Sequence, residues 1–148
     1  LKGLALVLGG DNANQLKLVI KAPSSHQFEE IKLETVASSI RSDGLFFKKF
    51  NLETVSGAIR MRNSIGEHID IESVSGAADL QIDKLKTADF ETVSGGVKLI
   101  SSSNPKVSFE SVSGGLNLEI PRESHVDVNF ESMTGELVNE FQVKKRSQ

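Results

Sequence analysis

The sequence predicts an all-β fold, a single-stranded β-solenoid of about six to eight coils with a 19-residue repeat. Two observations support this prediction. A motif that reads apolar, Glu, Thr or Ser, Val, Ser, Gly recurs along the chain, and each repeat contains two short stretches in which apolar and polar residues alternate. Alternation with a period of two is typical of a strand that is buried on one face.

The motif has five clear copies and one degenerate copy near the N-terminal side. Successive copies begin 19 residues apart, except for the last interval, which is 21 residues. Such regular spacing indicates a repeat architecture, in which each unit stacks on the one before it. The copies occupy residues 33–38 (degenerate), 52–57, 71–76, 90–95, 109–114 and 130–135.

Each repeat is expected to contain two strands and two corners. Residues 107–110 and 115–120 show the alternation clearly, and residues 69–72 show it in another repeat. The Ser-Gly step lies between the two stretches, and glycine suits a corner because it tolerates positive φ and close backbone approach. The second corner is expected to be looser, as at 101–106, and the longer last interval places its two extra residues there, around 121–124.

Stacked coils rise by about 4.8 Å each and bring equivalent residues into columns. Three apolar columns are expected in the core, because one 19-residue unit cannot bury its own apolar side. The first is Leu33, Leu52, Ile71, Phe90, Phe109 and Phe130; the second is Val36, Val55, Val74, Val93, Val112 and Met133; the third is Ile59, Ala78, Val97, Leu116 and Leu137.

The whole chain, 1–148, is predicted to form one domain. Stretches 4–8 and 16–20 are expected to be strands of atypical coils that cap the stack, because terminal repeats usually depart from the consensus. The expected divisions are 1–32 for these coils, 33–138 for the regular repeats and 139–148 for a polar C-terminal tail.

Composition excludes several classes of function and partner. The net charge is −3, with 17 basic and 20 acidic residues, so a nucleic-acid partner is not expected. No apolar run is long enough to cross a membrane. Cysteine is absent, which excludes disulfides and thiolate metal sites. Tyr and Trp are also absent, so no aromatic stacking platform for a sugar or a base is expected.

The Val-Ser-Gly steps resemble those of a bacterial adhesin-type family of β-solenoid repeat domains of unknown function. The resemblance covers 33–138 and is most specific at the steps that begin at Val55, Val74, Val93 and Val112. It implies a β-solenoid in an envelope or surface setting, and it brings no catalytic residues. The family often has Asp after the glycine, whereas this chain has Ala58, Ala77, Gly96, Gly115 and Glu136.

A column of carboxylates is the candidate surface site. A ladder at the coil spacing could bind divalent cations, which take oxygen ligands. The favoured alternative is a solvated face whose repulsion is offset by Arg41, Arg60 and Lys98, because calcium sites need convergent oxygens rather than one per coil. No metal site and no cofactor is therefore predicted. The column is Glu34, Glu53, Glu72, Glu91, Glu110 and Glu131.

Other patterns are interpreted as structural. The paired hydroxyls of the motif, such as Thr54 and Ser56, resemble an ice-binding surface, but hydrogen bonding to the corner backbone is the simpler interpretation. His26, His68 and His125 share no column and are interpreted as isolated surface histidines. No catalytic residue is predicted, because a catalytic site is normally made once from unlike groups. A carbohydrate-active β-helix remains a remote alternative that would require a unique cluster of charged residues.

The expected function is a non-enzymatic envelope-associated binding, adhesion or structural module at the bacterial cell envelope or surface. Its partner is expected to be a protein or an envelope component. The alternative is a self-assembling scaffold resembling the bactofilins, which stack solenoids end to end. Charged residues at a strand edge oppose such stacking, and Lys144, Lys145 and Arg146 lie near one end of the repeats. A monomer or small homo-oligomer is therefore expected, with either hand of the solenoid allowed.

Overall fold

The protein is an all-β solenoid, as the repeat predicts. The computed structural model describes residues 3–8, 17–20, 27–37, 39–121, 127–134, 137–139 and 144–146. Every strand pair in these ranges is parallel, and the strands form two rows that are joined through one long strand, β6 (Ile59–Ser73).

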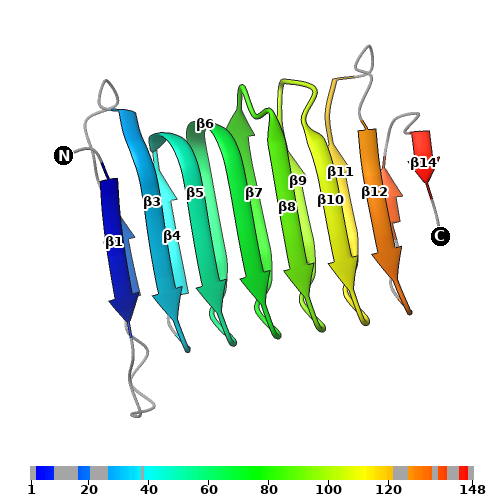
Figure 1. The fold of residues 1–148 in the computed structure, drawn as a ribbon, viewed down its shortest axis with the longest axis horizontal. Coiled ribbons are helices and arrows are strands. Elements are labelled where there is room, and N and C mark those ends of the chain that lie inside the picture. The colour runs from blue at the N-terminus through cyan, green and yellow to red at the C-terminus, as the bar shows by residue number, and fades with distance from the viewer. Residues whose placement is uncertain are drawn as a thin grey trace.

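We call the two rows the first layer and the second layer. The first layer consists of β1 (Gly3–Leu8), β3 (Gln27–Thr35), β5 (Phe46–Thr54), the second half of β6, β8 (Thr87–Thr92), β10 (Lys106–Ser111), β12 (Asp127–Ser132) and β14 (Lys144–Arg146). The second layer consists of β2 (Lys17–Ile20), β4 (Ser39–Asp43), the first half of β6, β7 (Ala78–Asp83), β9 (Val97–Ile100), β11 (Leu116–Glu119) and β13 (Leu137–Asn139). Figure 1 shows the coils side by side along the long axis, with β1 at one end and β14 at the other.

The strand register follows the repeat. In the first layer, Leu52 pairs with Leu33 on one side and with Ile71 on the other, and the first column continues in this way to Phe130. In the second layer, the third column pairs continuously from Ile59 to Leu137. The predicted alignment of both columns is therefore confirmed.

The core lies between the two layers and is filled by alternate residues of each strand. In β8, Ala88, Phe90 and Thr92 are buried, whereas the side chains between them face outward. All residues of the first column are at most 9% exposed, and the rings of Phe109 and Phe130 stack with their centroids 5.2 Å apart. The first column thus forms a continuous apolar core, as expected.

The second predicted core column is wrong. The five valines Val36, Val55, Val74, Val93 and Val112 are 45–48% exposed, and Met133 is 81% exposed. Thr or Ser takes the inward position instead, one residue earlier in each motif, as the exposures of 6% at Thr54 and 9% at Thr92 illustrate. The alternation of the strand continues to its last residue, so the residue after an inward Thr points outward whatever its polarity.

The buried hydroxyl has a structural role at the first corner, which joins each first-layer strand to the next second-layer strand. Thr54 Oγ1 accepts a hydrogen bond from the Gly57 N–H at 3.1 Å, and Thr92 Oγ1 accepts one from the Gly95 N–H at 2.8 Å. An apolar side chain there would leave this buried N–H without a partner. The prediction that the hydroxyls bond to the corner backbone is confirmed for these residues.

Close backbone approach explains the glycines of this corner. A Cβ added to Gly95 would lie 2.1 Å from the carbonyl oxygen of Gly76, and a Cβ on Gly114 would lie 2.2 Å from that of Gly95. The second expected reason, positive φ, is not observed at these glycines. Among the described residues, positive φ occurs at Gly44, Asn63 and Lys84, which lie at the second corner.

The ends of the chain also contribute strands. The two strands expected in the N-terminal part are present, because β1 pairs with β3 and β2 pairs with β4. The C-terminal segment expected to be a polar tail contains β14, which pairs with β12 and extends the first layer. Within the described ranges, no helix has the length and apolarity that crossing a membrane requires.

Candidate binding groove

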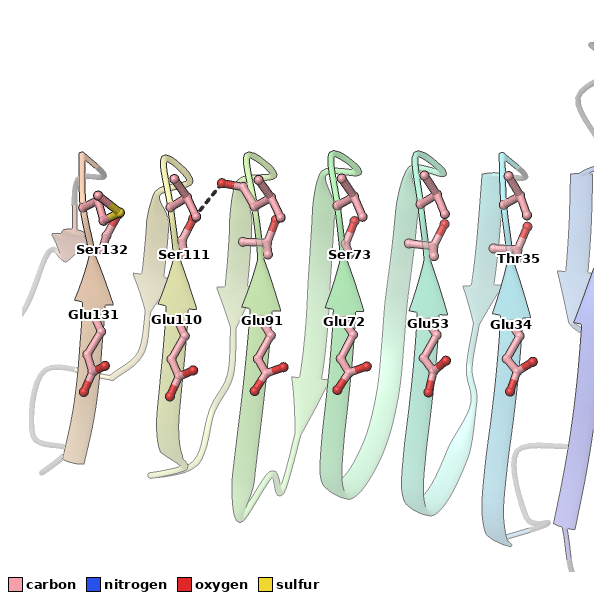
Figure 2. A pocket seen from close by; sticks show the side chains of 18 residues that line it. Glu34, Thr35, Glu53, Glu72, Ser73, Glu91, Glu110, Ser111, Glu131 and Ser132 are labelled. Atoms are coloured by element: carbon pink, nitrogen blue, oxygen red, sulfur yellow. Dashed lines mark hydrogen bonds between the residues drawn. The ribbon is translucent and has the colours of Figure 1, made fainter.

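The predicted carboxylate column exists and lies on the outer face of the first layer. Each glutamate pairs in register with the next, from Glu34 in β3 to Glu131 in β12. Figure 2 shows the six side chains aligned along the stack, on the same side of the strands. Four of them are exposed, and the two end members, Glu34 and Glu131, are partly exposed. The strand alternation places them outward because their neighbours on both sides face the core.

A row of apolar side chains runs beside the carboxylates, at the level of the first corner. It consists of the second column, and these six residues are the exposed large hydrophobic residues among the described part of the chain. The backbone beneath the row is hydrogen bonded between coils, because the Ser75 N–H donates to the Val55 carbonyl at 2.8 Å and the Ser94 N–H to the Val74 carbonyl at 2.9 Å. The row is therefore an exposed apolar surface on a rigid support. We call the six residues the apolar row: Val36, Val55, Val74, Val93, Val112 and Met133.

The glutamates, the inward hydroxyl residues and the apolar row together line one groove of about 960 Å³ (Figure 2). The groove spans six successive coils, from the end of β3 to the end of β12, and each coil contributes a Glu, a Thr or Ser, and an apolar residue. Its walls therefore repeat at the coil spacing of about 4.8 Å. This translational repeat makes the groove suitable for an elongated ligand rather than a compact one.

The outer face beside the groove is strongly acidic. The column two residues before the glutamates contains Asp70 and Asp89, which pair in register with each other, and a single basic residue, Lys32. With the six glutamates, these two columns hold eight carboxylates against one ammonium group. Lys32 Nζ lies 3.6 Å from Glu34 Oε1. Among the described residues, no other member of the glutamate column forms an ion pair.

The expected charge compensation from Arg41, Arg60 and Lys98 is wrong. These residues lie in β4, β6 and β9, on the outer face of the second layer and so on the opposite side of the core. Lys98 pairs there with Glu119 at 3.6 Å. Residue spacing brings these basic groups close to the motif in sequence, but the first corner turns the chain between them and the glutamates. These three residues therefore do not compensate the charge of the glutamate column.

The electrostatic environment of this face is visible at Asp70. Burial raises the pKa of Asp70 above its ordinary value, and the negative charges of Asp89 and Glu72 raise it further, while Lys49 acts in the opposite direction. Neighbouring carboxylates disfavour the charged form of one another. A cation that approached the groove would relieve this repulsion, so the face favours positively charged ligands.

The described carboxylates are not arranged as a metal centre. Within the described residues, no group of three or more His, Cys, Asp or Glu side chains is placed to hold a metal ion. His68 is exposed and hydrogen bonds through Nδ1 to Thr87 Oγ1 at 2.6 Å, while His26 and His125 lie outside the described residues. The paired hydroxyls form no flat outer surface of the ice-binding type, because the first of each pair is turned inward at Thr54 and Thr92.

The sequence predicted the carboxylates of the groove but not its apolar row. The alternation of inward and outward residues along the strand is the signal that identifies this row. In the segment 52–55, counting inward and outward positions from Leu52 places Glu53 outside, Thr54 inside and Val55 outside. Residue polarity favoured a buried valine, but position along the strand decides which face a side chain takes.

Comparison with known proteins identifies the family of this chain. Neither the curated proteins nor the solved structures contain a significant match to it. The family model described as Toastrack DUF4097, a domain family of unknown function, matches residues 11–148. This range includes every copy of the motif and the whole groove. The chain therefore belongs to the Toastrack DUF4097 family.

Proposed function

We propose that the chain is a non-enzymatic binding module that works at the bacterial cell envelope and uses the groove as its docking surface. The observation that carries the proposal is the apolar row. Single exposed apolar residues are ordinary on protein surfaces, whereas a contiguous apolar strip marks an interaction site. Here six large apolar side chains lie in one line along one groove.

Two further observations support a binding role over a catalytic one. The groove repeats the same three residue types in every coil, whereas catalysis requires unlike groups that converge at one point. The supporting backbone is held by hydrogen bonds between coils, so the surface is formed before any partner arrives. The resemblance of the Val-Ser-Gly repeats to a bacterial surface family supports the proposed envelope setting.

The experiment compares retention of purified protein on envelope fractions of the source cell. The test variant combines Val55→Ser, Val74→Ser and Val93→Ser, which removes half of the apolar row without touching the core. The control is Arg60→Gln, which changes an exposed residue on the opposite face. Wild type and the control should be retained, and the triple variant should be lost although its circular dichroism and melting temperature are unchanged. Equal retention of all three proteins would reject the groove as the docking surface.

The setting itself is tested separately by fractionation of the source cell. The proposal expects the natural protein in the envelope fraction and recovery of much of it by high-salt or detergent extraction. Recovery only in the soluble cytoplasmic fraction would reject the envelope location while leaving the binding role open to the retention assay.

The rival function is a self-assembling scaffold similar to the bactofilins. The observation that favours it is the regular parallel stacking, since a strand edge at the end of such a stack can template further pairing. The observation against it is the composition of β14, which is Lys144, Lys145 and Arg146, because charged edge strands oppose addition. Sedimentation of the natural chain distinguishes the two, with a monomer or small oligomer expected and long polymers favouring the scaffold.

A further inference from the structure

We propose that the partner segment that occupies the groove is a basic amphipathic α-helix lying along the stack. The inference rests on the proposed function and adds the chemistry of the partner. The apolar row makes the groove a docking surface, and the neighbouring carboxylates select the charge of the occupant. Both features run the length of six coils in parallel lines.

The first step is the charge of the occupant. Eight carboxylates in two columns face one basic residue, Lys32, and the pKa of Asp70 is raised by burial and by the acidic groups around it. A nucleic acid or an acidic peptide would add negative charge to this face, which like-charge repulsion disfavours. Among the described residues, the outer face of the second layer is not strongly basic, because it mixes Arg41 and Arg60 with Asp79 and Glu119, so this face of a second copy is not a matching occupant.

The second step is the secondary structure of the occupant. An extended strand gains its affinity from backbone hydrogen bonds at a free sheet edge. This groove offers no such edge, because its backbone N–H groups already bond between coils, as in the bonds from Val55 to Thr35 at 3.3 Å and from Ser56 to Val36 at 2.9 Å. A helix satisfies its own backbone and binds through side chains alone. The groove presents side chains, so a helix is the element that fits it.

The third step is the spacing. Six coils at about 4.8 Å span about 24 Å between the first and last members of a column. A helix covers that length with about 16 residues, and its turns repeat at about 5.4 Å, close to the coil spacing. Side chains on one face of a strand repeat at about 6.7 Å, which departs further from the spacing of the coils. Apolar residues on one stripe of the helix would meet the apolar row, and lysines or arginines on the next stripe would meet the glutamates.

The probe for the test is a synthetic peptide of about 18 residues with leucine and lysine placed to form adjacent stripes on a helix. One control peptide has the same composition in scrambled order, and another has glutamate in place of lysine. Binding is measured by calorimetry, and helix formation is measured by far-ultraviolet circular dichroism, which is sensitive here because the described part of the protein contains no helix. The peptide should bind and gain helical signal, whereas both controls should bind at least about tenfold more weakly.

Variants of the full chain test whether this binding depends on the glutamate column and on the apolar row. We expect Glu72→Gln combined with Glu91→Gln to weaken binding by roughly tenfold and to reduce its dependence on salt. Val74→Ser combined with Val93→Ser should weaken it by a similar factor with the salt dependence unchanged. Arg60→Gln should leave the dissociation constant within about twofold of wild type.

The possible failures are distinguishable. Equal binding of the scrambled peptide, or binding without a gain of helical signal, would overturn the helical partner and indicate attraction by charge alone. Absence of peptide binding would overturn it as well. If envelope retention still depended on the apolar row in those cases, the groove would remain the docking surface for a partner of different chemistry. If the peptide did not bind and envelope retention did not depend on the apolar row, the proposed function and this inference would both be rejected.

Discussion

The two corners of each coil are built in different ways. At the first corner, glycines of successive coils stack so closely that a Cβ on Gly76 or Gly95 would lie 2.1 Å from the carbonyl oxygen of the preceding glycine. At the second corner, the chain turns through positive φ at Gly44, Asn63 and Lys84, which are three different residue types. Sequence repetition is therefore strict where a Cβ would collide with the backbone of the neighbouring coil, and it is loose where a side chain has open space.

The largest expected effect distinguishes the buried first column from the exposed apolar row. Phe90→Ala should reduce the free energy of unfolding by about 3–5 kcal/mol, because a buried ring is replaced by a cavity. Val93→Ala, three residues later, should change it by less than about 0.5 kcal/mol, because this side chain is exposed. Denaturant unfolding of both variants measures the difference. A loss at Val93 comparable with that at Phe90 would contradict the outward orientation of the apolar row.

The next effect separates the reasons for glycine at the two corners. Gly95→Ala should destabilise the fold by about 3 kcal/mol, since the new methyl group meets backbone that must shift. Gly44→Ala should cost about 1–2 kcal/mol, because its φ of 71° is unfavourable for alanine although the space is open. Gly96→Ala is the matched control, with its nearest neighbour 3.8 Å away, and it should be almost neutral. Equal losses at Gly95 and Gly96 would show that the glycine stacking is not a close contact.

A smaller effect tests the hydroxyl at the first corner. Thr92→Val keeps the shape of the side chain and removes the acceptor of the Gly95 N–H, so it should cost about 1–3 kcal/mol. Thr92→Ser retains the acceptor and should restore most of the stability, since Ser73 fills the equivalent position one coil earlier and accepts from Gly76 at 2.9 Å. Thermal unfolding of the two variants provides the comparison. The hydroxyl would have no role at the corner if the valine variant matched the serine variant.

The smallest effect has the opposite sign and concerns the second corner. Lys84 has a φ of 60°, where glycine is free of the strain that a side chain imposes. Lys84→Gly should therefore raise stability by up to about 1 kcal/mol, seen as a higher melting temperature. The same substitution at Lys106, in strand β10, should lower stability by about 0.5–1 kcal/mol. A lower melting temperature for both variants would indicate that the second corner does not depend on positive φ.

Register was the most predictable property of this fold. The interval of 19 residues, which separates all copies but the last, allows one alignment of successive coils, and the pairing of Leu33, Leu52 and Ile71 follows that alignment. The loose second corner was also foreseeable from its irregular length. The positive φ of Lys84 was not, because lysine has no preference for that conformation and the strain is imposed by the coils on either side.

The candidate groove was only partly predictable, for a different reason. The glutamates stand out as a repeated charged residue between buried neighbours, and their column requires only the register. To predict the apolar row, one must know which face each residue takes at the corner. There the Thr54 hydroxyl accepts a hydrogen bond from the buried Gly57 N–H and so takes the inward position. Polarity alone predicts that valine is a core residue. The competition between polarity and backbone hydrogen bonding is resolved only when the corner is seen in three dimensions.

The translational repeat of the groove has a consequence for the statistics of binding. A ligand that contacts three coils could occupy roughly four equivalent positions on six coils, each shifted by one coil. Such degeneracy favours the bound state by about 0.8 kcal/mol through the number of arrangements alone. Movement between adjacent positions requires a shift of about 4.8 Å, with each contact exchanged for an equivalent one. A short ligand would therefore move along the groove in steps of one coil, whereas a ligand that spans all six coils would be held in a single position.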